Sequence, residues 1–130
     1  MKIRVHDEYS ETLKISQKEV LAFAELTGDD NPIHIDKEYA LKKGFNTNIV
    51  HGILSAGVFS RILGTKFPGY GSIYTYQDLK FIRPVYVDQK FTVNLKVISK
   101  SDNKYVISTQ IHTQEGIALN GTANILYKES

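Results

Sequence analysis

Residues Val50–Gly64, VHGILSAGVFSRILG, are apolar on nearly every side of a helix and are interrupted by His51 and Arg61. With these interruptions the segment is too short to span a bilayer, so we interpret it as a buried helix. Small residues on its first turns allow other backbone segments to approach closely: Gly52, Ser55, Ala56 and Gly57. We therefore predict that other elements wrap this helix on most of its sides.

On the carboxyl side of this helix, apolar residues recur with a period of two, which is typical of half-buried strands. The sequences SDNK (101–104) and QEG (114–116) supply turns between them. Together with the segment SETLKI (10–15), which precedes the helix, five strands are predicted: residues 10–15, 72–84, 91–97, 105–111 and 117–127. Because the connections are short, most neighbouring strands should be antiparallel. We predict an α+β fold, in which an antiparallel sheet of about five strands wraps around one long central helix.

Two further helices are predicted on the amino side of the apolar segment. Ser16 and Glu19 form a capping-box pair that begins a helix, and Gly28 ends it. Asp36 can cap a second, short helix, which has an acidic residue in its first turn and lysines in its last, as the helix dipole favours. Residues 28–34 then connect the two helices.

The composition is that of a single globular domain covering residues 1–130. Without cysteine, the chain has no disulfide, no thiolate metal site and no cysteine nucleophile. The formal net charge of +2 is small and dispersed, so neither nucleic acid nor a membrane is an expected partner. The amino terminus, MKIRVHDEYSE, is polar and lacks the apolar core of a signal peptide, so we expect a cytoplasmic protein.

The connection GDDNPIH (28–34) contains the residues best suited to chemistry. A continuous helix would separate Asp29 from His34, because residues five apart point in different directions. Gly28 stops such a helix, and Pro32 biases Asn31 away from helical geometry. A tight loop can therefore bring a carboxylate and an imidazole together as an acid/base pair. The same residues are also common turn formers, so a purely structural loop remains an alternative.

A metal site is a second alternative for the same region. His34, Asp36 and a later histidine, His51 or His112, imitate the two-histidine, one-carboxylate set of non-haem iron enzymes. Against this interpretation, Asp36 is needed as a helix cap, and such iron enzymes usually have larger all-strand barrels. We therefore predict no metal, and iron analysis of the purified protein would test this.

Three ordered segments resemble one family. Residues 27–34, TGDDNPIH, followed by the small residue Ala40, resemble the GDxNPxH signature of the MaoC-like (R)-specific enoyl-CoA hydratases. The resemblance continues through IVHGILSAGVFSRILG (49–64), which looks like the central-helix segment of that family, and DLKFIRPVYVDQKFTV (78–93), which looks like its following strand and turn. It spans roughly residues 16–98, and the combination is more selective than any one motif.

The resemblance implies a hot-dog fold and a homodimer with the active site at or near the subunit interface. It also implies that Asp29 acts as a base on one water, that His34 shares this activation, and that Asn31 supports the loop. The backbone N–H of Gly52 would face the thioester carbonyl. Some members carry a serine five residues after that glycine, where this chain has Gly57.

The reaction implied is syn hydration of a (2E)-enoyl-CoA to a (3R)-3-hydroxyacyl-CoA, without metal or redox cofactor, in which coenzyme A is the acyl carrier of the substrate. A (3R)-hydroxyacyl-acyl-carrier-protein dehydratase has the same chemistry with another thioester handle. Two weaker alternatives are a hot-dog acyl-CoA thioesterase and a non-catalytic acyl-CoA binding module. Binding alone does not need an acid/base pair, which argues against the last of these.

Overall fold

The computed structural model of the chain describes residues 2–129. Its helices are α1 (Gln17–Thr27), α2 (Pro32–Ile35), α3 (Lys37–Lys42) and α4 (Gly52–Thr65). Its strands are β1 (Glu8–Leu13), β2 (Ile73–Gln77), β3 (Lys80–Phe81), β4 (Phe91–Ser101), β5 (Lys104–Thr113) and β6 (Gly116–Leu126).

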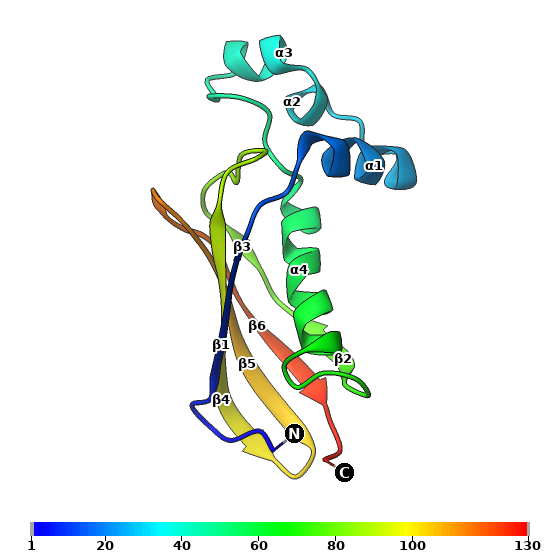
Figure 1. Cartoon of the computed structure of the whole chain (residues 1–130), viewed down its shortest axis with the longest axis vertical. Helices are drawn as coiled ribbons and strands as arrows, with labels where there is room; N and C mark the ends of the chain where they lie inside the picture. Colours follow the sequence, from blue (N-terminus) through cyan, green and yellow to red (C-terminus); the bar gives the residue numbers. More distant parts are fainter. Residues whose placement is uncertain (1, 130) are drawn as a thin grey trace.

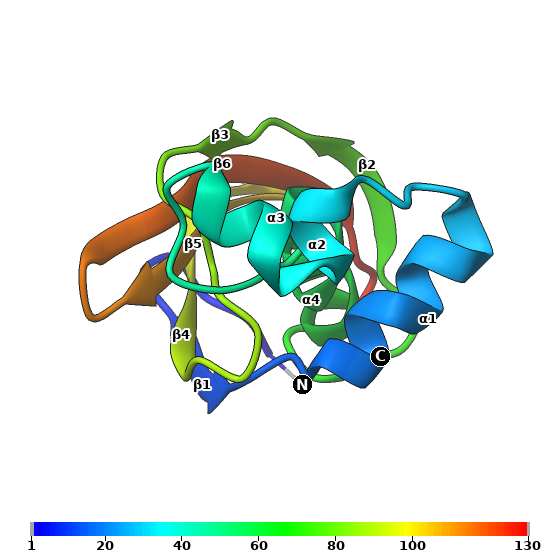
Figure 2. The same cartoon turned by 90° about the horizontal axis from the view of Figure 1, so that it is seen from above.

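The strands form one antiparallel sheet, with the order β1-β4-β5-β6-β2 and with β3 also paired to β6. Helix α4 runs along one face of this sheet, and α1, α2 and α3 gather at its amino end (Figure 1). Viewed from that end, the sheet curves around α4 (Figure 2). The predicted α+β architecture, with its central helix, is therefore confirmed.

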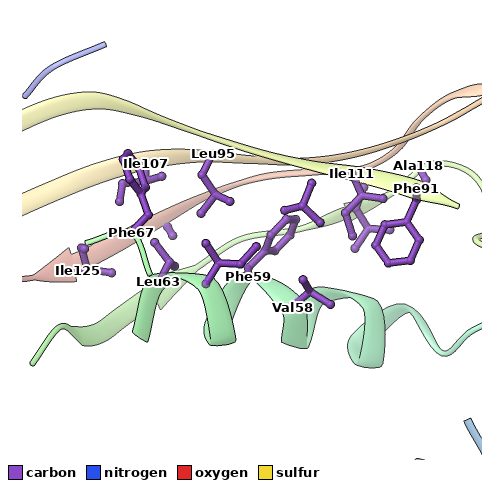
Figure 3. Packing of buried hydrophobic residues seen from close by; sticks show 14 of the residues in the cluster. Val58, Phe59, Leu63, Phe67, Phe91, Leu95, Ile107, Ile111, Ala118 and Ile125 are labelled. Carbon is purple, nitrogen blue, oxygen red and sulfur yellow. The ribbon is translucent and has the colours of Figure 1, made fainter. Parts of the chain in front are cut away.

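The core lies between α4 and the concave face of the sheet. Val58, Phe59 and Leu63 point from α4 towards sheet residues that include Leu95 and Ile107 (Figure 3). The alternate residues of β4 that the period of two assigns to the core, from Phe91 to Val97, are almost completely buried. Burying a large apolar side chain stabilises a fold by about 1.5–3 kcal/mol, so this layer accounts for much of the stability.

The predicted helix starts and the long hairpins are also present. Ser16 and Glu19 make both hydrogen bonds of the capping box, at 3.1 Å and 2.9 Å, and the carboxylate of Asp36 caps α3 through the backbone N–H of Tyr39. Strand β1 begins and ends two residues earlier than predicted, because Ile15 turns into the core just before α1.

The single strand predicted over residues 72–84 is wrong, because it is divided into β2 and β3. At the break, the backbone of Asp78 crosses close to β6, and its N–H donates to the carbonyl of Thr122 at 3.0 Å. A Cβ atom at Gly121 would lie 1.9 Å from the carbonyl oxygen of Asp78, so this crossing requires glycine. The sheet therefore has six strands in the described part of the chain, one more than the number of about five that the sequence predicted.

Helix α4 is covered less completely than predicted. The sheet buries one side of it, whereas Ile53 on the opposite side is 61% exposed. A Cβ atom at Gly57 would meet nothing within 4 Å. One side of the central helix is thus open in the single chain. No helix within residues 2–129 is both long and apolar enough to cross a membrane.

Candidate active site

The site is built around the turn that joins α1 to α2. Gly28 adopts the left-handed conformation, with φ of 81°, and its N–H donates to the carbonyl of Ala24, which ends α1. Asn31 then caps α2, because its side chain accepts a hydrogen bond from the N–H of Ile33, and Pro32 is the first residue of the helix. His34 therefore lies on a short helix that follows the turn, whereas the sequence predicted a tight loop through residue 34. The prediction failed because proline disfavours a helix before itself but suits the first helical position.

His34 is buried and held in a defined orientation. Its Nδ1 lies 2.7 Å from the carbonyl oxygen of Ile49. A carbonyl can only accept, so Nδ1 carries the hydrogen, and in the neutral ring Nε2 is left as a free acceptor. The backbone of α2 is also fixed, because the side-chain amides of Asn48 and Gln17 donate to the carbonyls of Ile33 and His34 at 3.0 Å and 2.9 Å.

His51, which immediately precedes α4, completes the buried part of the site. Its ring stacks on that of His34, with centroids 3.8 Å apart and planes inclined by 26°. The centroid of the Phe23 ring lies 4.7 Å from that of His51. Its Nε2 donates to the backbone carbonyl of Asp29 at 2.9 Å. Its Nδ1 is buried and has no hydrogen-bond partner among the described residues.

These contacts bring Asp29 and His34 together, as the loop argument expected. One carboxylate oxygen of Asp29 and one ring nitrogen each of His34 and His51 lie within 4.8 Å of one another. Asp29 is exposed to solvent, whereas both histidines are buried. The site therefore places an exposed carboxylate beside a buried imidazole, and a single water could hydrogen-bond to both, since each such bond spans about 2.8 Å.

Burial lowers the pKa of His34 below its ordinary value. The neighbouring ring of His51 lowers this pKa further, whereas the hydrogen bond to Ile49 and the carboxylate of Asp29 act in the opposite direction. Because the net shift is downwards, the imidazole favours its neutral form at neutral pH. A neutral ring with a free Nε2 can accept a proton, which is what a general base requires.

The metal set considered from the sequence is not assembled. The Oδ1 of Asp36 accepts the N–H of Tyr39 at 3.2 Å as the cap of α3, and His112 lies on β5, where its Nε2 is 2.9 Å from the side-chain oxygen of Gln110. The nearer group of Asp29, His34 and His51 is also poorly arranged for a metal. Metal-binding lone pairs lie in the ring planes, and in two rings stacked at 26° these planes do not converge well on one ion.

Gly52 is the first residue of α4, beside the histidine pair. A Cβ atom there would lie 2.6 Å from two ring carbons of Phe81, so the close approach of this ring depends on glycine. The hydroxyl of Ser55 is buried and donates to the carbonyl of Gly52 at 2.7 Å. This hydroxyl is therefore engaged within the helix.

A mainly apolar pocket of about 450 Å³ opens beside Gly52. Its walls include Phe45, Ile49, Ile53, Phe81, Ile82 and Val85. Asp29 and His34 are not among the lining residues, although Ile49, which binds the ring of His34, is. The pocket and the acid/base pair are therefore neighbours, joined through Ile49 and the start of α4.

Sequence reasoning missed two buried residues of this site. His51 was considered only as a possible metal ligand, and Asn48 was not considered at all. The HG pair at the start of the apolar helix was a usable signal for His51, because this histidine is the neighbour of Gly52, the glycine predicted to face the thioester carbonyl. Nothing in the local sequence marks Asn48, since its partner Ile33 is fifteen residues away.

A family model, curated relatives and solved structures all indicate the same family for this chain. Residues 3–116 match the family model described as MaoC like domain. The (R)-specific enoyl-CoA hydratase of Aeromonas caviae is 43% identical over 108 residues, which cover 81% of each chain. The mitochondrial 3-hydroxyacyl-[acyl-carrier-protein] dehydratase of Arabidopsis thaliana is 36% identical over 107 residues, which cover 81% of this chain and 63% of that protein.

Among solved structures, the (R)-hydratase from A. caviae involved in PHA biosynthesis superposes with a TM-score of 0.92 at 36% identity. The superposition covers 97% of this chain and 98% of that one. The similarity thus extends over nearly the whole fold, including the turn between α1 and α2 and the start of α4.

Proposed function

The chain belongs to the MaoC-like dehydratase family and has its hot-dog fold, and from this premise we propose that it is an (R)-specific enoyl-CoA hydratase. The reaction is the reversible syn addition of water to a (2E)-enoyl-CoA, which gives a (3R)-3-hydroxyacyl-CoA. The observation that carries this proposal is the pairing of Asp29 with the buried ring of His34, whose Nδ1 is occupied and whose Nε2 is free.

Asp29 and His34 each offer one acceptor to the same water. As the oxygen of this water attacks C3, one of its protons passes to the acid/base pair, with Asp29 as the base and His34 sharing the activation. The C2=C3 electrons move towards the thioester carbonyl, and the pair returns the proton to C2. Hydroxyl and proton come from the same side of the substrate, so the addition is syn.

Gly52 serves the other end of the substrate. Its backbone N–H is at the amino end of α4, where N–H groups lack helical partners and the helix dipole favours negative charge. A thioester carbonyl placed there gains stabilisation as it becomes an enolate oxygen. Asn31 does not touch the substrate in this scheme; as the cap of α2, it holds the turn that carries Asp29 and His34.

We also propose that two copies of the chain form a homodimer. Residues along β2 and β3 are largely exposed even though several are large and apolar, and the outer edge of β2 has no partner strand among the described residues. Such an edge is normally paired or covered. Ile53 and Phe81, at the pocket beside Gly52, are exposed by 61% and 53%, so a second copy could cover part of this site as well. Light scattering during gel filtration gives the oligomeric state.

The decisive assay is the loss of enoyl-thioester absorbance when crotonyl-CoA and longer (2E)-enoyl-CoA substrates are mixed with the protein. A coupled dehydrogenase that accepts only (3R)-3-hydroxyacyl-CoA reports the stereochemistry. Asp29→Asn is the control that should remove the activity while keeping the fold. Unchanged absorbance with every enoyl thioester would refute the proposal.

Three further measurements with the same thioester substrates separate the alternative functions. The Arabidopsis relative is named for an acyl-carrier-protein substrate, so an acyl-carrier-protein thioester should compete with the CoA thioester if this chain prefers that carrier. Release of free thiol would indicate a thioesterase. Binding of acyl-CoA without turnover would indicate a non-catalytic binding module.

A further inference from the structure

We infer that His51 is a positioning residue, which holds the Asp29 turn and the ring of His34 in register with the start of α4. The inference rests on the proposed hydratase function, because it concerns the residues that perform that reaction. It assigns no contact with substrate to His51. His51 has four features that support this role: its bond to Asp29, its stack on His34, the absence of a side-chain cap at α4 and its unpaired Nδ1.

The hydrogen bond from His51 to Asp29 connects the turn at residues 28–30 to a distant part of the chain, whereas the backbone N–H groups of the turn bond only to nearby residues. The N–H groups of Gly28, Asp29 and Asp30 are all bonded within residues 24–28. In contrast, the Nε2 of His51 reaches the carbonyl of Asp29 across twenty-two residues, at 2.9 Å. Within the described residues, this bond fixes the exposed turn to the central helix.

The ring of His51 also defines the position of the catalytic ring. It is 2% exposed, and it contacts the rings of both Phe23 and His34. Since His34 is anchored at Nδ1 by Ile49, the stack restrains the remaining freedom of its ring and thus the direction of Nε2. His51 therefore contacts both members of the acid/base pair, one through its backbone and one through its ring.

Neither helix capping nor packing accounts for a histidine at this position. His51 is the N-cap residue of α4, yet its side chain makes no capping hydrogen bond and turns to the Asp29 carbonyl instead. A carbon ring would pack in the same space without leaving a buried nitrogen unpaired, and an unsatisfied buried polar atom is costly. The feature that a carbon ring cannot supply is the Nε2 donor.

The Nε2 donor matters for the reaction because His51 directly precedes Gly52 in the chain. Gly52, the proposed donor to the thioester oxygen, is the next residue. His51 thereby ties the turn that carries Asp29 to the residue next to the proposed carbonyl-binding group, in addition to the bonds that Asn48 and Ile49 make to α2. Misplacement of reacting groups by about 1 Å can lower a rate by about a hundredfold, so such a tie is worth more to turnover than to substrate binding.

A first test uses the unaltered protein. Long-range ¹H–¹⁵N correlation spectra distinguish the two ring nitrogens of each histidine. We expect the hydrogen on Nε2 of His51 and on Nδ1 of His34. A hydrogen on Nδ1 of His51 in the neutral ring would remove the proposed donor and overturn the inference, whatever the activity of the protein.

A second test separates the donor from the ring. His51→Phe keeps a stacked ring and removes the donor, whereas His51→Gln keeps an amide donor near the position of Nε2. We expect His51→Phe to lower kcat by about ten- to a hundredfold with little change in KM, and His51→Gln to recover part of that loss. The matched control is His112→Gln, a histidine on β5 away from the site, which should leave kcat unchanged.

A double-mutant cycle then shows whether His51 acts through Asp29. In an Asp29→Asn background, His51→Phe should cost much less than it does alone, because the group it positions is already disabled. Multiplicative losses, or a His51→Phe variant that melts earlier but keeps its kcat, would overturn the inference. If the unaltered protein hydrates no enoyl thioester, the proposed function fails instead, and the nitrogen assignment still tests the bond itself.

Discussion

Replacing one of two adjacent aspartates should lower turnover strongly, whereas replacing the other should leave most of it. Asp29 and Asp30 are neighbours, both are exposed, and both exchange a carboxylate for an amide of the same shape when changed to asparagine. Only Asp29 belongs to the group whose atoms lie within 4.8 Å of a ring nitrogen of His34. Asp29→Asn therefore removes the base from the acid/base pair, and Asp30→Asn removes a carboxylate that faces solvent.

The expected loss for Asp29→Asn is about a hundredfold or more in kcat, the usual contribution of a positioned acid/base group. This factor corresponds to about 2.7 kcal/mol of lost transition-state stabilisation. Neither carboxylate is bonded to another side chain within residues 2–129, so the melting temperature should change little in either variant. The stability comparison thus separates a chemical loss from an unfolded protein.

Initial rates with crotonyl-CoA, measured over a range of concentrations for both variants, give kcat and KM separately. Asp30→Asn should keep most of the activity. If Asp30→Asn were inactive and Asp29→Asn active, the assignment of the motif to the chemistry would be one residue out of register, and the mechanism would have to be redrawn around Asp30.

Three further predictions concern protonation, the carbonyl site and the core. Burial lowers the pKa of His34, so NMR titration should place it below the ordinary value of about 6.5. Between these two pKa values the folded state binds fewer protons than the unfolded chain, so the protein should lose stability as the pH falls from about 6.5 through the folded pKa. A titration midpoint above 6.5 would contradict this. Gly52→Ala should lower kcat/KM by about tenfold or more, because the new methyl group and the displaced ring of Phe81 crowd the carbonyl site. The melting temperature should change little, since the ring of Phe81 is half-exposed and can move. Unchanged kinetics would contradict the proposed place of the thioester carbonyl at this backbone N–H. Phe59→Ala should lower the free energy of unfolding by about 3–5 kcal/mol in urea titrations because the ring is completely buried between α4 and the sheet, and a loss below about 1 kcal/mol would show that this layer is not the core.

Features that depend on neighbouring residues could be predicted from the sequence. The capping box of Ser16 and Glu19, the cap at Asp36 and the alternating strands are short-range patterns whose physical causes act within a few residues. The pairing of Asp29 with His34 followed from the same kind of reasoning, since Gly28 and Pro32 rule out a continuous helix. The family resemblance then supplied the chemical roles, which spacing alone could not.

Features that depend on distant residues could not be predicted. The break at Asp78 exists because Gly121, on another strand, allows the backbone of Asp78 to cross close to it. No residue near Asp78 in the sequence predicts this break. Asn48 and His51 join the site through hydrogen-bond partners fifteen and twenty-two residues away. The open side of α4 was missed for a related reason: an apolar surface shows that a helix is to be covered, but not whether the same chain covers it.

The break at Asp78 has a practical consequence for redesign. It divides one edge of the sheet into β2, whose outer edge has no partner strand among the described residues, and β3, where Phe81 forms part of the pocket wall. Because the crossing at Gly121 anchors the chain between them, substitutions at Phe81 or Ile82 can reshape the pocket without shifting the register of β2. The wall of the pocket can thus be altered without moving the edge strand beside it.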